Sequence, residues 1–330
     1  MSSVQGPTSA PQSLTVALPD GVVRQLLEGP ALPARSLEAA VQPFRLHLAG
    51  ASGGVALTGD PVAIGLGRQM LEQMTGILHG GARIDEIEVR RIAAATVETA
   101  LKHDLAFRLS GLRLPVRPMS LSQVAFLNAM LFSQQSLIFG LGPTGTGKTH
   151  LAIVAGLALV ADEKFKSLVI TRPHVLMEGE VMTPSLRAET IYDEQFAPIE
   201  DELRELISPE EIRRLTDQGR IEIAPLGRMR GRTFNESFII VDEAQNLSVK
   251  KMRMAVTRLG RGSRMVITGD MAQTDLPQGE ASGLPHLLNL ISGTDLALVH
   301  QFSLSQIIRN DLVARLEALY ARDGGLRAAA

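Results

Sequence analysis

Several residue types are missing or scarce in this chain of 330 residues, and each absence excludes a class of chemistry. No cysteine occurs, which excludes disulfides, thiolate metal sites and cysteine nucleophiles and is compatible with a reducing compartment. Tryptophan is absent and aromatic residues make up only 4% of the chain, which argues against recognition of nucleic-acid bases by stacking. The seven histidines show no spacing typical of metal ligands. Function must therefore depend on charged groups, hydroxyls, amides or the backbone.

Long hydrophobic runs and an excess of one charge are missing as well. The longest apolar run, around residues 151–161, is interrupted and too short to cross a bilayer, and the opening MSSVQGPTSAPQS lacks the features of a signal peptide. With 33 basic against 35 acidic residues the formal net charge is −2, so no global attraction to nucleic acid or to a membrane arises. Hydrophobic residues make up 45% of the chain, enough for a substantial core. We expect a globular, cytoplasmic protein with no membrane partner.

Composition and pattern change three times along the chain. The start is rich in Ser, Pro, Gln and Gly. The next part combines two alternating strands, FRLHLAG and GVALTG, that turn at GASG, with two helical patterns, of which the first opens with Asp60 and Pro61 and places Met70 and Met74 in the core. Two prolines and a glycine then mark the segment GLRLPVRPMS. These changes predict a disordered tail at residues 1–13, a small α+β domain at 14–110, a linker at 111–120 and a second domain at 121–330.

Six short apolar runs alternate with helical patterns in the second domain. Runs that are apolar on both faces are typical of parallel strands buried between two layers of helices. The sequence therefore predicts an α/β fold with a parallel sheet. The runs lie in SLIFGLG, SLVITRP, RIEIAPL, FIIVDEA, RMVITGD and LALVHQF.

A glycine-rich segment, GPTGTGKTH, follows the first of these runs and leads into a helical pattern. Its spacing, G-x-x-x-x-G-K-[ST], is that of a phosphate-binding loop, and the motif requires this position between a strand and a helix. The glycines let the backbone curl with its amides inward, and the helix N-terminus adds a favourable dipole. A plain glycine turn is the alternative. We expect Lys148 to contact the β- and γ-phosphates of a nucleotide and the Thr149 hydroxyl to bind Mg²⁺. The candidate nucleotide-binding residues are Gly142, Pro143, Thr144, Gly145, Thr146, Gly147, Lys148, Thr149 and His150.

The run FIIVDEA ends in two acidic residues. In phosphate-loop proteins this edge of the sheet holds Mg²⁺, which predicts Asp242 as a metal ligand. Glu243 would orient and deprotonate an attacking water as a general base. A strand end that faces solvent is the alternative, because an apolar run followed by two acids is common. We expect both carboxylates to face the loop across a neighbouring strand tip.

A third strand end, RMVITGDMAQTDLP, offers Gly269, Asp270 and Gln273. A side-chain amide at such a position could contact the γ-phosphate and report its hydrolysis. A turn with an Asx cap is the alternative interpretation.

Together these strings resemble the PhoH family of phosphate-loop ATPases, in its form with an N-terminal extension. The resemblance covers roughly residues 115–310, where RP, GPTGTGKT, ITRP, GRMRGRTF, DEAQN, ITGDMAQTDLP and IIRNDLV occur in the family's order. It implies a RecA-like core similar to that of superfamily-one helicases and ATP hydrolysis linked to RNA. It also implies a homo-oligomer similar to ring-forming ATPases, with a hexameric ring expected, in which neighbouring subunits complete the active site. The N-terminal domain resembles the KH-like domain attached to this family.

The resemblance implies roles for three further residues. Gln273 matches the γ-phosphate sensor of helicases, and Gln123 resembles the glutamine that holds adenine in those enzymes. A solvated residue at a helix start is the alternative for Gln123. Arg309, in QIIRNDLV, falls where the family has an arginine that could stabilise charge on the γ-phosphate, as an arginine finger does.

Basic residues concentrate in one stretch, residues 228–264, with nine Arg or Lys against three acids. Binding of an RNA backbone needs such a local patch. A solvated helix face and a surface between subunits are the alternatives.

We therefore expect an Mg²⁺-dependent ATPase that acts on RNA. One alternative is a kinase for a small acceptor, which would need a lid with several arginines and an acceptor pocket. Another is a nucleotide-gated adaptor or switch with little turnover.

Overall fold

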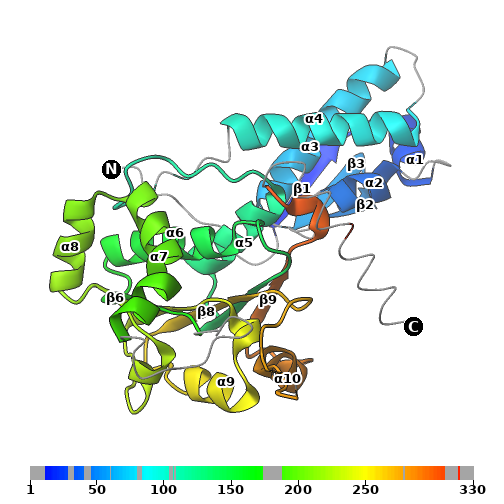
Figure 1. Ribbon diagram of the computed structural model, residues 1–330. Coiled ribbons are helices and arrows are strands. Elements are labelled where there is room, and N and C mark those ends of the chain that lie inside the picture. The colour runs from blue at the N-terminus through cyan, green and yellow to red at the C-terminus, as the bar shows by residue number, and fades with distance from the viewer. Residues whose placement is uncertain are drawn as a thin grey trace. The chain divides into compact units, whose positions relative to one another are not determined.

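The chain folds into two compact units, one of residues 1–107 and 117–128 and the other of residues 108–116 and 129–330 (Figure 1). The computed structural model describes residues 12–28, 33–40, 46–59, 61–79, 84–103, 107, 109–173, 188–277, 279–308 and 319. The predicted fold class is confirmed, since a small α+β unit precedes a unit built on a parallel sheet. The domain boundaries stay a prediction, because helix α5 (Leu121–Phe132), at the expected start of the second domain, is divided between the two units.

A three-stranded antiparallel sheet forms the centre of the first unit. Strands β2 (His47–Ala51) and β3 (Gly54–Gly59) make the predicted hairpin, and β1 (Gln12–Ala17) pairs with the other side of β3. The sequence does not predict β1, whose first two residues belong to the expected disordered tail; residues 1–11 of that tail lie outside the described residues. A Cβ on Gly54 would lie 2.0 Å from the Val16 carbonyl oxygen, so only glycine allows β1 to approach so closely.

Helices α1 to α4 and the first part of α5 pack around this sheet in the described part of the first unit. Helix α3 packs on β1 and β3, and α4 packs on α2 and α3. Met70 and Met74 of α3 are fully buried, which confirms their predicted place in the core. Both of the predicted long helices are present, although the proposed cap Asp60 lies outside the described residues. The helices are α1 (Asp20–Glu28), α2 (Pro33–Ala40), α3 (Pro61–His79) and α4 (Glu86–His103).

The second unit is built on a six-stranded sheet in which every neighbouring pair of strands is parallel. The order is β6-β5-β7-β8-β4-β9, and all six predicted apolar runs are confirmed as strands. Strand β8 lies between β4, which leads into the glycine loop, and β7, which ends before the acidic pair, so one strand separates the two motifs. The strands are β4 (Leu137–Leu141), β5 (Ser167–Thr171), β6 (Ile221–Ile223), β7 (Ser237–Val241), β8 (Arg264–Gly269) and β9 (Leu298–Gln301).

Helices cover both faces of this sheet. Helix α6 lies on one face, where a Cβ on Gly156 would come within 2.6 Å of Leu168 and 3.0 Å of Phe238. Helices α9 and α10 cover the opposite face, where Met252 and Leu284 pack with alternate residues of the strands. None of the described helices combines the length and the apolar composition needed to cross a membrane. The helices are α6 (Lys148–Ala161), α7 (Ala188–Leu206), α8 (Pro209–Asp217), α9 (Val249–Val256) and α10 (Gly283–Ile291), with 3₁₀ turns η2 (Leu226–Met229), η3 (Ala244–Asn246) and η4 (Leu304–Gln306).

Candidate functional site

The glycine loop joins the end of β4 to the start of α6. Gly142, Gly145 and Gly147 have φ angles of 137°, 83° and 83°, which side chains rarely allow. At Gly142 a Cβ would also lie 2.6 Å from the Phe302 carbonyl oxygen. The predicted helix is present as α6, which begins at Lys148, so its first N–H groups end in the loop without intrahelical partners. The backbone therefore has the curled form and the helix terminus that an anion site needs.

The Lys148 side chain folds back onto its own loop. Its Nζ donates to the carbonyl oxygens of Gly142 at 2.6 Å and Pro143 at 2.7 Å, and only 9% of the residue is exposed. Burial lowers the pKa of this ammonium below its ordinary value, while nearby carboxylates, Asp270 first among them, act in the opposite direction. The ammonium is thus held beside the loop, with acidic groups close enough to favour its charge.

Asp242 connects the loop to the acidic strand end. Its Oδ1 accepts hydrogen bonds from the Thr149 hydroxyl at 2.7 Å and from the Thr268 hydroxyl at 2.6 Å. Thr149 opens α6, and Thr268 belongs to β8, the strand that lies between β4 and β7. Asp242 itself is 3% exposed, which contradicts the alternative of a strand end that faces solvent. The structure therefore brings Thr149 and Asp242 together, although the sequence does not identify Thr268 as the third member.

Glu243 follows in a left-handed conformation, with φ 51° and ψ 43°. Such a backbone is unusual for a residue with a side chain and is found where surrounding contacts fix it. Gln245 Nε2 donates to Glu243 Oε2 at 2.5 Å, and an Arg172 nitrogen donates to Oε1 at 3.4 Å. Burial, reinforced by the neighbouring Asp242 charge, raises the pKa of the Glu243 carboxyl, and the contacts from Gln245 and Arg172 oppose that shift. The result is a carboxyl with a raised proton affinity beside a second, deeply buried one.

Arg172 and Gln245 are site residues that the sequence reasoning missed. The Arg172 guanidinium lies 4.0 Å from Asp242 Oδ2 as well as 3.4 Å from Glu243, so it faces both acids. Gln245 bonds Glu243 and also accepts from the Asp270 backbone N–H at 3.0 Å, which ties the end of β7 to the end of β8. Arg172 directly follows β5 in ITRP, and Gln245 lies four residues after the end of β7 in DEAQN, so the available signal was their place close to the end of a buried strand.

Three other residues are predicted to contact the nucleotide: Gln273, Gln123 and Arg309. Gln273 is exposed in the stretch after β8. Gln123 lies in α5, in the part that belongs to the first unit. It is only 4% exposed, and its Oε1 accepts a hydrogen bond from the Met119 N–H at 2.7 Å. The alternative of a solvated residue at a helix start is therefore wrong. Arg309 lies outside the described residues, although the N–H of its neighbour Ile308 donates to the Gly145 carbonyl oxygen at 2.9 Å. The nucleotide contacts expected of all three stay predictions.

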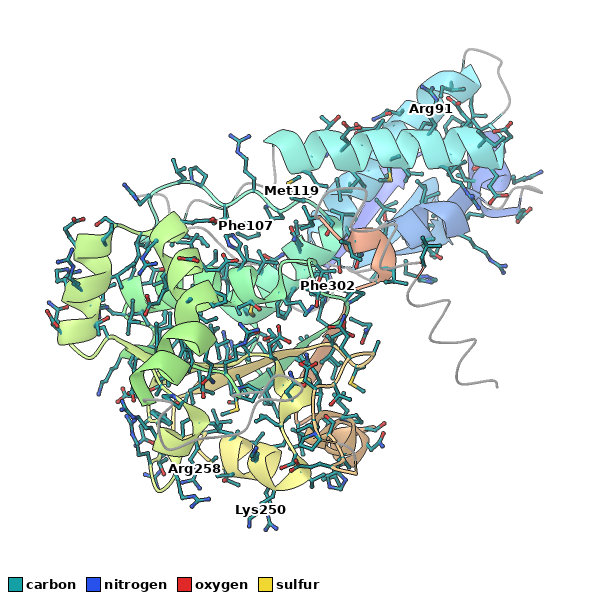
Figure 2. The ribbon with its side chains drawn as sticks, in the orientation of Figure 1. Arg91, Phe107, Met119, Lys250, Arg258 and Phe302 are labelled. Carbon is teal, nitrogen blue, oxygen red and sulfur yellow. The ribbon has the colours of Figure 1, made fainter. Side chains whose placement is uncertain are left out.

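The basic stretch divides into internal and external members. Arg264 is internal: its guanidinium bonds the carbonyl oxygens of Met130, Ser133 and Gln135, and burial lowers its pKa. Arg232 is exposed but forms an ion pair with Glu222 through both of its terminal nitrogens. Figure 2 shows Lys250 on the outer side of α9, pointing away from the unit. Six members are exposed and form no ion pair with another described residue: Arg228, Arg230, Lys250, Lys251, Arg253 and Arg261.

Comparison with known proteins decides the family. A family model described as PhoH-like protein matches residues 115–321, more than half of the chain. The chain belongs to the PhoH family. A PhoH-like protein of Mycobacterium tuberculosis is 34% identical over 286 residues, which cover 84% of this chain and 79% of that protein. A PhoH-like protein of Bacillus subtilis is 32% identical over 275 residues, 81% of this chain and 84% of that protein.

Among solved structures, one match is the SWI2/SNF2 ATPase core of Sulfolobus solfataricus in complex with dsDNA, and the alignment covers 59% of this chain and 46% of that one. The TM-score is 0.36 and the sequence identity is 15%. That score is too low to equate the two folds. Membership in the PhoH family, with a phosphate loop on a parallel sheet, makes this chain a nucleotide-binding protein of the P-loop NTPase class.

Proposed function

We propose that this PhoH-family protein is an Mg²⁺-dependent ATPase. The contact of 2.7 Å between the Thr149 hydroxyl and Asp242 Oδ1 supports this most strongly, because it joins the phosphate loop to an acidic strand end 93 residues later. Hydroxyl and carboxylate oxygens are the ligands that Mg²⁺ prefers, so this donor set fits the ion. When bound, Mg²⁺ would neutralise charge on the phosphates. Thr149 and Asp242 would hold it.

Lys148 and the loop amides would bind the triphosphate. In the structure the Lys148 ammonium is satisfied by two carbonyl oxygens of the loop. A triphosphate offers the same ammonium charged acceptors, which form stronger hydrogen bonds than neutral carbonyls. We expect Lys148 to leave Gly142 and Pro143 when a nucleotide binds. The loop then supplies backbone N–H groups that need no rearrangement of side chains.

Glu243 would act as the general base toward water. Its pKa is raised by burial and by Asp242, and a base is most effective when its pKa approaches the working pH. Gln245 and Arg172 hold its two oxygens in place. A base fixed beside the metal ligand favours hydrolysis over transfer to an acceptor, which is why we prefer an ATPase to the kinase alternative. Gln273 and Arg309 would sense and stabilise the γ-phosphate.

RNA would bind through the six exposed cations defined above. They form no ion pairs within the described part of the chain, so their charges can neutralise phosphates. Aromatic residues make up only 4% of the chain, which favours contact with the backbone over readout of bases. We propose that hydrolysis drives remodelling of RNA, in a helicase-like manner, within a hexameric ring in the cytoplasm. The exposed cations support the proposed RNA binding, and the resemblance to the PhoH family supports the helicase-like action and the ring.

A second candidate function is a nucleotide-gated adaptor with little turnover. The observation in its favour is that Lys148 and Glu243 both have partners within the site, as expected of a stable resting state. Such a protein would bind ATP and change its partners without rapid hydrolysis. Steady-state turnover separates the two candidates.

The test is phosphate release by the full chain, with and without Mg²⁺ and with and without single-stranded RNA. Glu243→Gln should retain ATP binding and lose about 10²–10⁴-fold in turnover. Lys148→Ala should lose binding as well. Glu236→Gln is a matched control, because Glu236 has the same left-handed backbone, with φ 50°, but is exposed and pairs with Lys166. Normal turnover by Glu243→Gln would refute the hydrolytic assignment, and near-zero turnover by the wild type with RNA would favour the adaptor.

A further inference from the structure

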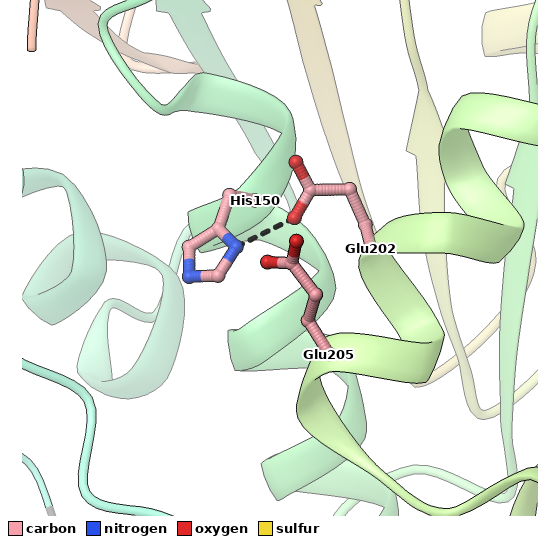
Figure 3. A group of neighbouring side chains, drawn as sticks. All are labelled: His150, Glu202 and Glu205. Atoms are coloured by element: carbon pink, nitrogen blue, oxygen red, sulfur yellow. Dashed lines mark hydrogen bonds and ion pairs between the residues drawn. The ribbon is translucent and has the colours of Figure 1, made fainter. Parts of the chain in front are cut away.

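His150 directly follows the proposed magnesium ligand Thr149, but its ring is directed toward α7. Its Nδ1 lies 2.6 Å from Glu202 Oε2. Glu205, one turn further along the same helix, directs its carboxylate to the same point, as Figure 3 shows. One ligand atom from each of the three side chains lies within 4.8 Å of the other two.

No lysine or arginine in the described part of the chain forms an ion pair with either carboxylate, and Glu202 has only the His150 ring as a partner. Arg204 lies between them in the sequence, but its guanidinium pairs with Glu200 and Asp201 on another side of α7. Glu205 forms no ion pair with any residue that the structure describes. Like charges at this separation repel each other, and a cation between them would remove that repulsion. The cluster is also accessible, since the His150 and Glu202 side chains are about one third exposed and Glu205 is exposed.

We propose that His150, Glu202 and Glu205 bind a divalent transition-metal ion, with Zn²⁺ as the best match. An imidazole nitrogen and two carboxylate oxygens form a ligand set that Zn²⁺ accepts, whereas Mg²⁺ and Ca²⁺ prefer oxygen ligands alone. Ligand atoms around a tetrahedral Zn²⁺ lie about 3.3–3.6 Å apart. Small side-chain rotations that move His150 Nδ1 and Glu202 Oε2 apart from 2.6 Å would therefore give the spacing that the ion needs. Three protein ligands leave the fourth position for water.

The ion would join α6 to α7 next to the phosphate loop. His150 belongs to the first turn of α6, directly after Lys148 and Thr149. The ligands come from segments 52 residues apart, so the metal would restrain the start of α6 through tertiary contacts. This assigns the His150 side chain to a cation and not to the nucleotide. The site differs from the proposed Mg²⁺ site, whose carboxylate is Asp242, and it does not depend on ATP hydrolysis.

The test is a calorimetric titration of the full chain, without nucleotide, with ZnCl₂ in stoichiometric amounts. We expect one Zn²⁺ per chain and a rise in the melting temperature on binding. His150→Gln and Glu205→Gln should each weaken binding by about tenfold or more and remove the thermal shift. Binding should persist in Asp242→Asn, which removes the other metal site. It should also persist in His286→Gln, which removes an exposed histidine of α10.

Cobalt provides a second readout, because its visible absorption reports the ligand geometry. Co²⁺ should give bands that disappear on addition of one equivalent of Zn²⁺ and that are absent in His150→Gln. Three results would overturn the proposal: no Zn²⁺ bound by the wild type, unchanged affinity in both His150→Gln and Glu205→Gln, or loss of the bound ion in Asp242→Asn. Circular dichroism of each variant shows whether the fold is retained, and Glu205→Gln, on an exposed side chain, preserves it on our account.

Discussion

Replacement of Thr268 by valine tests the hydrogen bond on which the acidic pair depends. The Thr268 hydroxyl is completely buried and donates to Asp242 Oδ1 at 2.6 Å. Valine keeps the shape of threonine but leaves the carboxylate without this donor. Hydrogen bonds to charged groups contribute about 1.5–3 kcal/mol. For a unit of this size, that loss lowers the melting temperature by roughly 3–12 °C. ATP turnover should fall too, because Asp242 loses one of the two hydroxyls that orient it.

Thr171 of β5, which β7 separates from β8, provides a matched control. It ends β5, is fully buried like Thr268, and its hydroxyl has no hydrogen-bond partner among the described residues. An unpartnered buried hydroxyl destabilises a protein by about 1–3 kcal/mol, so Thr171→Val should leave stability unchanged or raise it. The two substitutions are chemically identical, and only the presence of the carboxylate partner differs.

The assay is thermal and urea unfolding followed by circular dichroism, without nucleotide, because the absence of tryptophan leaves little intrinsic fluorescence. Equal losses of stability in Thr268→Val and Thr171→Val would show that the loss of a buried hydroxyl, and not the contact with Asp242, sets the effect. A stable Thr268→Val with normal turnover would refute the role given to this bond.

Three further predictions concern the loop, the acidic pair and the basic surface. Gly142→Ala should weaken ATP binding, because a backbone φ of 137° costs a residue with a side chain about 1–3 kcal/mol. Equilibrium binding of a fluorescent ATP analogue measures the change in affinity. Arg172→Ala should shift the acid limb of the pH–turnover profile to higher pH. The positive charge of Arg172 lowers the pKa of Glu243, so its removal raises that pKa further, and a general base must be ionised to act. Lys251→Gln should reduce the slope of log affinity for RNA against log salt by about 1 if this side chain meets a phosphate.

Each of these three has its own control. Gly227→Ala, where an added Cβ meets no atom within 4 Å, should leave ATP binding unchanged. Arg172→Lys should keep the acid limb near its original pH, because the positive charge remains. Lys164→Gln removes an exposed lysine outside the basic stretch, so an equal change in its salt slope would show that the stretch has no special role.

The local sequence pattern was enough to predict the strands and the phosphate loop of the second unit. The six apolar runs became the six strands because each is short, apolar on both faces and bounded by turn residues. The phosphate loop was equally predictable, since its glycines are required by backbone angles that its own sequence determines. By contrast, β1 forms only because β3 offers it an edge, and its first residues read as part of a polar tail.

Tertiary contacts account for what the sequence could not predict at the site. Strand order places β8 between β4 and β7, which brings Thr268 to Asp242, and no local pattern encodes that order. Arg264 looks like part of a basic surface in the sequence, yet its guanidinium bonds three backbone carbonyl groups of its own unit. The cluster around His150 has no signature along the chain, because its two acids come from a different helix, α7.

A crystal structure of the full chain with Mg²⁺ and a non-hydrolysable ATP analogue tests the central claim most directly. We predict that the triphosphate lies in the loop of residues 142–149, that Thr149 and Asp242 hold the metal, and that Lys148 Nζ has moved from the Gly142 and Pro143 carbonyl oxygens to a phosphate. A triphosphate bound elsewhere, or a Lys148 still bonded to those carbonyls beside a bound nucleotide, would contradict the account.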